Sequence, residues 1–145
     1  MDKLDVRELK YGSVEYQQEL ELRDKVLRQP LGMSLYDENL DADKKSIHIG
    51  AFVEKQLVGV LLLTELKSDE VKMRQVAVDE TFRLLKLGSK MVSFAEEYSK
   101  QNGYSSMVLN ARKTAVEFYK KLGYSIISDE FLEIKIPHYK MCKKL

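Results

Sequence analysis

Apolar residues recur along this chain with two different periods. In the segment 47–53 every second position is apolar, and the segments 57–66 and 71–78 are rich in Val, Leu and Met; short polar turns separate the three. This pattern predicts three consecutive strands that form an antiparallel meander. A helical period covers 87–101, and the Asn-Gly pair that follows it is typical of a left-handed helix end.

Turn and cap residues divide the rest of the chain. Ser13 is the predicted N-cap of a helix over 15–28, which Pro30 and Gly32 end. Residues 33–46 are expected to form an irregular loop with room for one helical turn. The remaining predicted elements are a first strand at 6–11, a short buried strand at 104–109, a helix at 114–122 that Gly123 closes, strands at 124–127 and 131–136, and an edge strand at 139–142 beyond an interruption at Pro137.

This order of elements predicts an α/β fold: a mixed, mostly antiparallel sheet with helices on both faces and two crossover connections. No Ser- or Gly-rich linker and no internal repeat divides the 145 residues. We therefore expect a single domain over 1–145.

Charge and composition narrow the class of protein. Lys and Arg number 24 against 23 Asp and Glu, so the chain has no electrostatic footprint for nucleic acid or an anionic membrane. The longest apolar run, 57–63, is too short to span a bilayer. The lone Cys142 excludes an intrachain disulfide and fits a reducing compartment, so a cytoplasmic location is expected.

The junction after the strand at 71–78 is the first feature with chemical content. A hydrophobic strand runs into a turn, and Gly88 then stands at the start of the long helix. The free N–H groups and positive dipole of a helix N-terminus can hold a pyrophosphate. Taken alone, the same pattern also fits an ordinary strand–helix connection.

Three stretches together resemble a known family. Residues 73–78 (Met-Arg-Gln-Val-Ala-Val), followed by Arg83 and Gly88, resemble motif A of the GCN5-related N-acetyltransferases (GNAT). Residues 111–124, with Ala-Val-Glu-Phe-Tyr-Lys-Lys-Leu-Gly-Tyr at their end, resemble motif B, and the tail at 130–141 looks like that of the ElaA/YjcF-like bacterial branch. The resemblance implies an acyl-CoA N-acyltransferase fold and transfer of acetyl from acetyl-CoA to a primary amine.

One position departs from the family pattern. Lys86 stands where the first glycine of the phosphate loop belongs, a glycine that lets the backbone approach phosphate without a Cβ in the way. Lys86 could add a cation beside the diphosphate, or its side chain could obstruct the loop. We expect coenzyme A binding to survive the change, with the same or a lower affinity.

The resemblance also implies site residues. Main-chain groups of Val76 and Val78 would pair with the pantetheine arm like an added strand, and main-chain N–H groups of 84–90 would hold the pyrophosphate. Acetyl-CoA would enter where the strands at 71–78 and 104–109 splay apart. The full set of implied cofactor positions is Val76, Ala77, Val78, Arg83, Leu84, Leu85, Lys86, Leu87, Gly88, Ser89, Lys90, Asn110, Ala115, Phe118 and Tyr119.

Three residues are the catalytic candidates, and each also has a structural interpretation. Tyr119 would support the departing thiolate while the amine attacks the thioester directly, or it is a helix aromatic packed beside Phe118. His138 and Glu133 are candidates for the base that deprotonates the amine, with Glu130 a further option. His48 is interpreted as structural, and the two histidines lack metal-ligand spacing, so no metal is expected.

The acceptor cannot be read from the sequence. A small amine, an amino sugar, a polyamine and a protein N-terminus or lysine all stay open, and Arg23 and Arg28 either line the acceptor site or face solvent. The acceptor would approach between the first helix and 130–140. Two alternatives to an enzyme also stay open: a non-catalytic acyl-CoA sensor on the same fold, and a structural protein, for which the C-terminal edge strands could support a homodimer.

Overall fold

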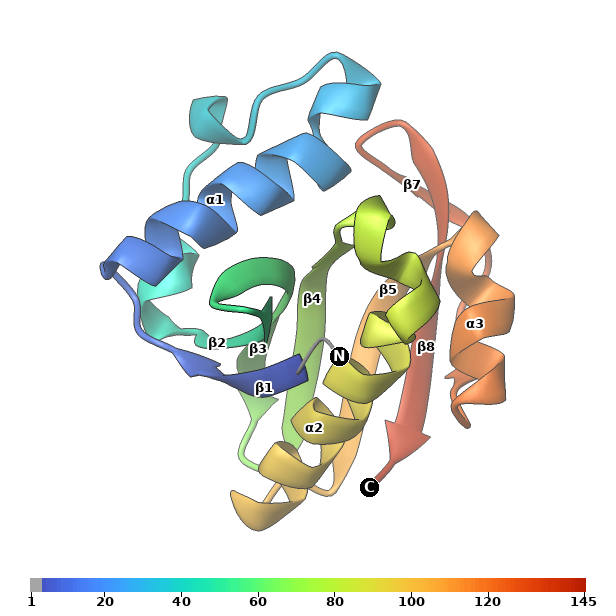
Figure 1. The fold of residues 1–145 in the computed structure, drawn as a ribbon. Helices are drawn as coiled ribbons and strands as arrows, with labels where there is room; N and C mark the ends of the chain where they lie inside the picture. Colours follow the sequence, from blue (N-terminus) through green and yellow to red (C-terminus); the bar gives the residue numbers. More distant parts are fainter. Residues whose placement is uncertain (1–3) are drawn as a thin grey trace.

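The computed structural model describes residues 4–145, except for the side chains of 83–85. Within this range the strands form one mixed sheet (Figure 1). The elements are β1 (Leu4–Leu9), α1 (Val14–Leu27), three 3-10 turns (Gln29–Leu31, Leu35–Asp37, Asp41–Lys45), β2 (Ile47–Val53), β3 (Gln56–Lys67), β4 (Glu70–Val78), a 3-10 segment (Glu80–Leu85), α2 (Leu87–Gln101), β5 (Ser106–Arg112), a 3-10 turn (Lys113–Ala115), α3 (Val116–Lys121), β6 (Ser125–Ile126), β7 (Phe131–Glu133) and β8 (Ile136–Lys144).

The strand order is β1-β2-β3-β4-β5-β8-β6, and β7 also pairs with β8. Every neighbouring pair is antiparallel except β4 and β5, which run parallel. The predicted fold class, a mostly antiparallel mixed sheet in an α/β chain, is therefore confirmed.

Local signals place most elements where the sequence predicts them. The predicted helix at 87–101 and strand at 47–53 match α2 and β2, and Ser13 caps α1 by accepting a hydrogen bond from the Tyr16 N–H at 3.2 Å. The turn between β2 and β3 uses two left-handed residues, Glu54 and Lys55, as a two-residue hairpin requires. These features follow from short-range chemistry, which a sequence reports directly.

Two apolar cores cover the two faces of the sheet. One core packs α2 and α3 against the sheet through residues such as Leu87, Met91 and Val116. The other packs α1 and the 3-10 turn at Leu35–Asp37 against the opposite face, around Leu20, Phe52 and other residues of β2 and β3. Each large apolar side chain buried in this way contributes about 1.5–3 kcal/mol to stability. The two cores fix which strand residues face which group of helices.

The C-terminal third departs from the prediction. The strand predicted at 131–136 is wrong: β7 ends at Glu133, Ile134 and Lys135 form a left-handed two-residue turn, and the chain returns as β8. β8 is also not an edge strand, because β5 lies on one side of it and β6 and β7 lie on the other. The turn escapes prediction because its residues are not the Asn and Gly that normally favour positive φ.

Pro137 lies within β8 and does not interrupt it. It pairs with Leu132, one step outward from the two-residue turn, which is a non-hydrogen-bonded position of the hairpin. On its other side, pairing with β5 ends at Arg112 and His138. The missing N–H of proline therefore has no strand partner to lose.

The strand predicted at 104–109 and the helix predicted at 114–122 are also shifted. β5 runs three residues further, to Arg112, and a 3-10 turn precedes a shorter α3.

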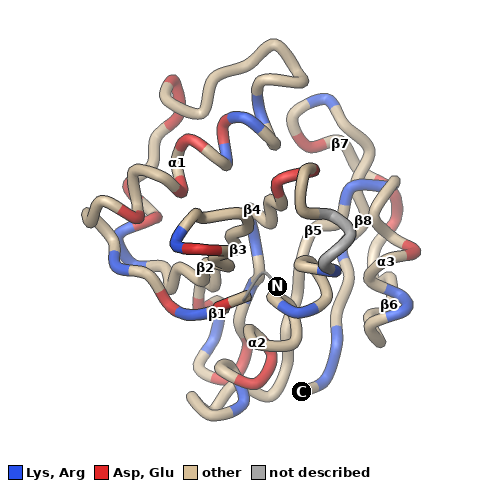
Figure 2. The backbone as a smooth tube through the Cα atoms, viewed as in Figure 1, with Lys and Arg blue, Asp and Glu red and all other residues tan. Residues whose placement is uncertain are grey.

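Charged residues of both signs are interspersed along the chain (Figure 2). Among residues 4–145, no helix is both long and apolar enough to cross a membrane.

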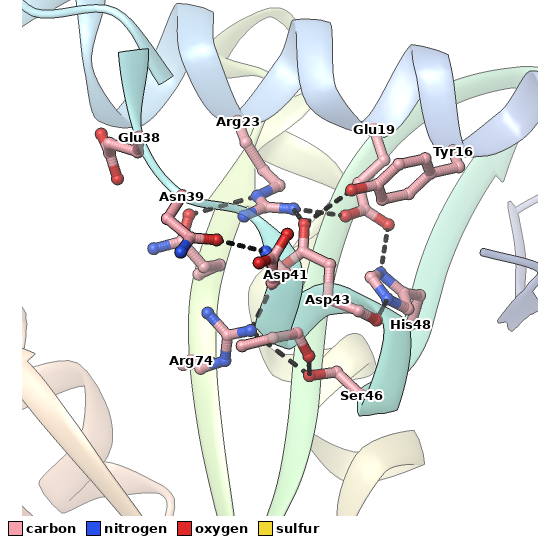
Figure 3. Close-up of polar contacts among 12 residues, drawn as sticks. Tyr16, Glu19, Arg23, Glu38, Asn39, Asp41, Asp43, Ser46, His48 and Arg74 are labelled. Atoms are coloured by element: carbon pink, nitrogen blue, oxygen red, sulfur yellow. Dashed lines mark hydrogen bonds and ion pairs between the residues drawn. The ribbon is translucent and has the colours of Figure 1, made fainter. Parts of the chain in front are cut away.

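Charged side chains, rather than apolar ones alone, anchor α1 to the sheet (Figure 3). Glu19 and Arg23 of α1 and Asp43 of the third 3-10 turn are all at least 99% buried. The Arg23 guanidinium Nη1 donates to Glu19 Oε2 at 2.7 Å and to Asp43 Oδ2 at 2.8 Å. Arg74 of β4 donates to Asp43 Oδ1 at 3.1 Å. Removing one member of such a buried group leaves an uncompensated charge, which costs about 3–5 kcal/mol.

His48 completes this buried network, as its structural interpretation predicts. Its Nδ1 lies 2.7 Å from Glu19 Oε1 and its Nε2 lies 2.7 Å from the Asp43 carbonyl oxygen. Both partners are acceptors, so both ring nitrogens donate and the ring is an imidazolium. Burial opposes the charge, but the hydrogen bond to the Glu19 carboxylate outweighs it and raises the pKa of His48 above 6.5.

The raised pKa of His48 predicts stability that falls with rising pH. A group with a higher pKa in the folded state stabilises the fold fully below its unfolded pKa of about 6.5, and loses that contribution as the pH rises through the folded value. We expect the free energy of unfolding to fall above pH 6.5 by at most about 1.4 kcal/mol per pH unit from this group. Urea titrations across pH 6–9 measure the slope. In His48→Gln the overall stability should drop and this slope should disappear; a variant with an unchanged slope would contradict the assignment.

Candidate active site

The sheet opens between β4 and β5. Their parallel pairing covers only Glu70–Lys72 against Ser106–Val108, so both strands lose contact well before their C-terminal ends. A cavity of about 430 Å³ fills the opening, lined by the end of α1, β4, β5, the 3-10 turn before α3, Tyr119 of α3, and the β7–β8 hairpin. The separation that the sequence interpretation expects between these strands is thus present.

A bulge in β4 shapes one wall of this cavity. Arg74 pairs with Leu62, but Ala77 pairs with Val60, so β4 holds one extra residue there. Gln75 takes up that residue in a left-handed conformation, with φ of 55°. Its side-chain oxygen accepts a hydrogen bond from Arg23 Nε at 3.2 Å. Because bulges bend a strand and disrupt pairing, this feature accounts for the departure of β4 from β5.

The cavity connects the two faces of the sheet. Leu109 and Ala111 of β5 belong to the core under α2 and α3, so the alternating residues Asn110 and Arg112 point to the face that carries α1. His138 pairs directly with Arg112 and shares its face. Tyr119 comes from α3 on the other face, and all of these side chains line the same cavity.

Tyr119 lines the cavity, and its hydroxyl is free to donate. The residue is 7% exposed and its ring packs edge-on against Phe118, with 5.0 Å between ring centroids. Within the described residues its hydroxyl makes no hydrogen bond. Burial raises the pKa of Tyr119 to about 12, so the phenol keeps its proton at neutral pH. The hydroxyl can therefore donate to an acceptor that enters the cavity.

His138 and Glu133 both line the cavity, but His138 is buried and Glu133 is exposed. His138 is 4% exposed, stacks on Phe131, and donates from Nδ1 to the Ile136 carbonyl at 2.7 Å. This bond places a proton on Nδ1, and in the tautomer with a single ring proton Nε2 carries the lone pair. Glu133 is exposed and accepts from Asn110 Nδ2 at 3.0 Å, which uses one of the two N–H donors of that amide.

Glu130, the further candidate, does not line the cavity; its carboxylate pairs with Lys113 at 3.0 Å.

The turn before α2 presents main-chain groups rather than side chains. Lys86 adopts φ 56° and ψ 41°, the left-handed conformation that a glycine would adopt easily, and its side chain is exposed. No side chain caps α2, and its first turn has no acidic residue. Leu87 is buried, and a Cβ on Gly88 would lie 3.2 Å from Phe118 Cζ, so Gly88 also makes room for that ring.

The cavity thus gathers part of the predicted set. The structure places Val76, Asn110, Ala115, Tyr119, Glu133 and His138 in its lining, whereas Ala77, Val78, Phe118 and 86–90 lie outside it. The side chains of Arg83, Leu84 and Leu85 lie outside the described residues. Sequence reasoning missed several lining residues: Lys72, Arg74, Gln75 and Arg112 among them. Arg112 was missed because the continuous apolar run that predicts β5 ends at Leu109, so the sequence did not place Arg112 on a strand.

Comparison with known proteins identifies the class. The acetyltransferase (GNAT) domain family matches residues 15–145, so this chain belongs to that family. It is 34% identical over 110 residues to the uncharacterised protein YyaT of Bacillus subtilis, covering 76% of this chain and 74% of YyaT. It is 29% identical over 123 residues to the uncharacterised N-acetyltransferase YjcF of the same organism, covering 84% and 87%.

Solved structures agree on the fold. Escherichia coli ElaA superposes with a TM-score of 0.82 at 21% identity over 99% of both chains. A GNAT family acetyltransferase from Elizabethkingia anophelis with acetyl-CoA bound superposes with a TM-score of 0.75 at 13% identity over 100% of both. The expected similarity to the ElaA/YjcF-like branch and the acyl-CoA N-acyltransferase fold are therefore confirmed.

The left-handed Lys86 predicts an unusual response to substitution. A residue with a Cβ pays about 1–2 kcal/mol to adopt this conformation, and a β-branched residue adopts it least well. We expect Lys86→Gly to raise the free energy of unfolding by about 1 kcal/mol, and Lys86→Val to lower it by a similar amount. Chemical denaturation of the three proteins measures both. Equal stability of the Gly and Val variants would show that this turn is not held in the left-handed conformation.

Proposed function

We propose that this protein transfers an acetyl group from acetyl-CoA to a primary amine, by direct attack of the amine in a ternary complex. The observation that carries the proposal is the cavity that joins the two faces of the sheet. It brings Tyr119 from the α2–α3 face together with His138 from the α1 face. Membership of the GNAT family and neighbours described as acetyltransferases support the same activity.

The residues present fit acetyl-CoA. The inner edge of β4 beyond Lys72 has no β5 partner, so the main chain around Val76 and Val78 is free to pair with an extended pantetheine arm. The uncapped first turn of α2, from Leu87 to Lys90, would hold the pyrophosphate through N–H groups. When bound, acetyl-CoA supplies the thioester carbonyl that the amine attacks.

Tyr119 would act as a hydrogen-bond donor to the leaving sulfur. Its pKa of about 12 lies roughly 3.5 units above that of an ordinary thiol, near 8.5. At about 1.4 kcal/mol per unit, full transfer of the Tyr119 proton to a thiolate would cost about 5 kcal/mol. A charge-assisted hydrogen bond has no such cost, so the hydroxyl stabilises the thiolate without giving up its proton.

His138 would accept the proton that the amine must lose. Its Nε2 lone pair remains free while Nδ1 is held by the Ile136 carbonyl. Glu133 is the alternative base, but its carboxylate is exposed and already accepts from Asn110. The pH dependence of turnover in His138→Gln, compared with Glu133→Gln, distinguishes the two roles.

A non-catalytic acyl-CoA sensor on the same fold is the alternative. It predicts saturable binding of acetyl-CoA with no transfer to any amine. The sensor alternative rests on Lys86, which replaces a glycine of the family pattern and could obstruct the phosphate loop. The side chain of Lys86 is exposed, however, and its backbone adopts the left-handed conformation that a glycine would adopt easily. Tyr119 favours the enzyme, because its hydroxyl has no partner among the described residues and can donate to the sulfur that leaves.

The Tyr119→Phe variant tests the enzyme directly. The phenylalanine keeps the ring packing and removes only the free hydroxyl, so we expect kcat to fall by about 10- to 100-fold. Acetyl-CoA affinity and the free energy of unfolding should stay within about twofold and about 0.5 kcal/mol, since no hydrogen bond of the folded protein is lost. Coenzyme A release with the best acceptor from a panel of primary amines measures kcat, and calorimetry measures affinity.

Tyr124→Phe is the matched control. Tyr124 packs beside Tyr119, but its hydroxyl donates to Glu96 Oε2 at 2.8 Å and does not line the cavity. This variant should lose stability, by about 1 kcal/mol, and keep its activity. If wild-type protein binds acetyl-CoA but transfers acetyl to no amine, the sensor replaces the enzyme. If Tyr119→Phe turns over as fast as the wild type, the role of the hydroxyl is refuted.

A further inference from the structure

The cavity wall has an excess of positive charge. Arg28, Lys72, Arg74 and Arg112 line it, and Glu133 is the one carboxylate among the lining residues. Two of the four cations already have a carboxylate partner: Arg28 pairs with Glu38, and Arg74 pairs with Asp43 at 3.1 Å. The two remaining cations, Lys72 and Arg112, have no carboxylate within salt-bridge distance in the described part of the chain.

Arg112 is the better placed of these two. Its Nη2 donates to the Leu27 carbonyl at 3.2 Å, the same oxygen that accepts from Arg28 Nη1 at 3.1 Å. The two guanidinium groups therefore meet at the C-terminal end of α1. Burial, and next the nearby Arg28, lower the pKa of Arg112, and the Glu133 carboxylate opposes this shift only in part. One carbonyl oxygen uses only one of the five N–H donors of a guanidinium.

Arg112 and Arg28 lie away from the proposed pyrophosphate site at the first turn of α2. Arg112 points to the sheet face that carries α1, whereas the first turn of α2 lies on the opposite face. Arg28 belongs to the residues that end α1 itself. The two cations thus stand on the side from which an acceptor would reach the thioester, and not beside the helix end that suits phosphate.

On the basis of the proposed function, we propose that the acceptor is an amine that also carries an oxyanion, a carboxylate or a phosphate, which Arg112 binds with Arg28 beside it. The planar fork of a guanidinium matches two oxygens of either group. The oxyanion would supply the ion-pair partner that Arg112 does not have among the described residues. Polyamines fit this wall badly, because their second positive charge would face Arg112.

Matched pairs of amines test the proposal. 4-Aminobutanoate is compared with butylamine, O-phosphoethanolamine with ethanolamine, and putrescine serves as a dicationic amine. Coenzyme A release gives kcat/KM for each, and calorimetry gives their binding to protein saturated with coenzyme A. The variants are Arg112→Gln, Arg112→Lys, which keeps the charge but not the fork, and Lys113→Gln, which removes an exposed charge one residue away and outside the cavity.

We expect the anionic member of at least one pair to be preferred by 10-fold or more, and the pair that responds identifies carboxylate or phosphate. Arg112→Gln should lose that preference by about 10- to 100-fold through KM, Arg112→Lys should lose part of it, and Lys113→Gln should keep it. Acetyl-CoA affinity should be unchanged in all three, and their thermal unfolding should confirm that they are folded.

Several outcomes would overturn the proposal while the acetyltransferase stands. They are equal or better use of the neutral amines or putrescine, a preference that survives Arg112→Gln, and weaker acetyl-CoA binding in Arg112→Gln, which would assign the cation to the cofactor. If no amine is acetylated, the calorimetry decides, and an absence of binding by both anionic amines refutes the proposal. Failure of the wild type to bind acetyl-CoA would refute the proposed function itself, and this inference with it.

Discussion

The short pairing between β4 and β5 is the constraint on which the rest of this structure depends. Three residues of each strand pair, and then the bulge at Gln75 turns β4 away. A sheet that opens in its middle leaves main-chain groups without strand partners, which is costly unless a ligand or water satisfies them. The same opening creates the cavity, so the feature that weakens the sheet also makes the site.

Buried charges hold this opening in place. Arg23 contacts Glu19, Asp43 and the Gln75 side chain, and so it links α1 to the bulge. Because α1 is fixed in this way, its C-terminal end carries Arg28 to the cavity wall, where Arg112 shares the Leu27 carbonyl with it. The network therefore connects the stability of the fold to the geometry of the cavity wall that carries Arg28 and Arg112. On the other face, apolar packing of Phe118 against Gly88 fixes α3 and positions Tyr119.

How far the sequence predicts this molecule depends on the range of the interactions involved. The helix at 87–101 and the strand at 47–53 have a strong local period, and the structure matches both. The C-terminal hairpin could not be predicted, because Ile134 and Lys135 give no turn signal and their left-handed conformation is imposed by the pairing around them.

The residues of the candidate site also differ in how far the sequence predicts them. Tyr119, His138 and Glu133 were identified through their resemblance to a family, and all three line the cavity. Glu19 and Arg23 lie on a helix where charges usually face solvent, so no sequence pattern marks them as buried. Arg112 follows the last apolar residue of its strand, and only the pairing with His138 shows that the strand continues to it.

The central claim is that the opening between β4 and β5 receives acetyl-CoA, and amide hydrogen exchange measures it most directly. Exchange would be followed by mass spectrometry or NMR with and without saturating acetyl-CoA. The account predicts slower exchange for amides in 73–78 and 86–90, with little change in β1 and β2. Saturable binding with protection confined to other segments, and none in these two, would contradict it.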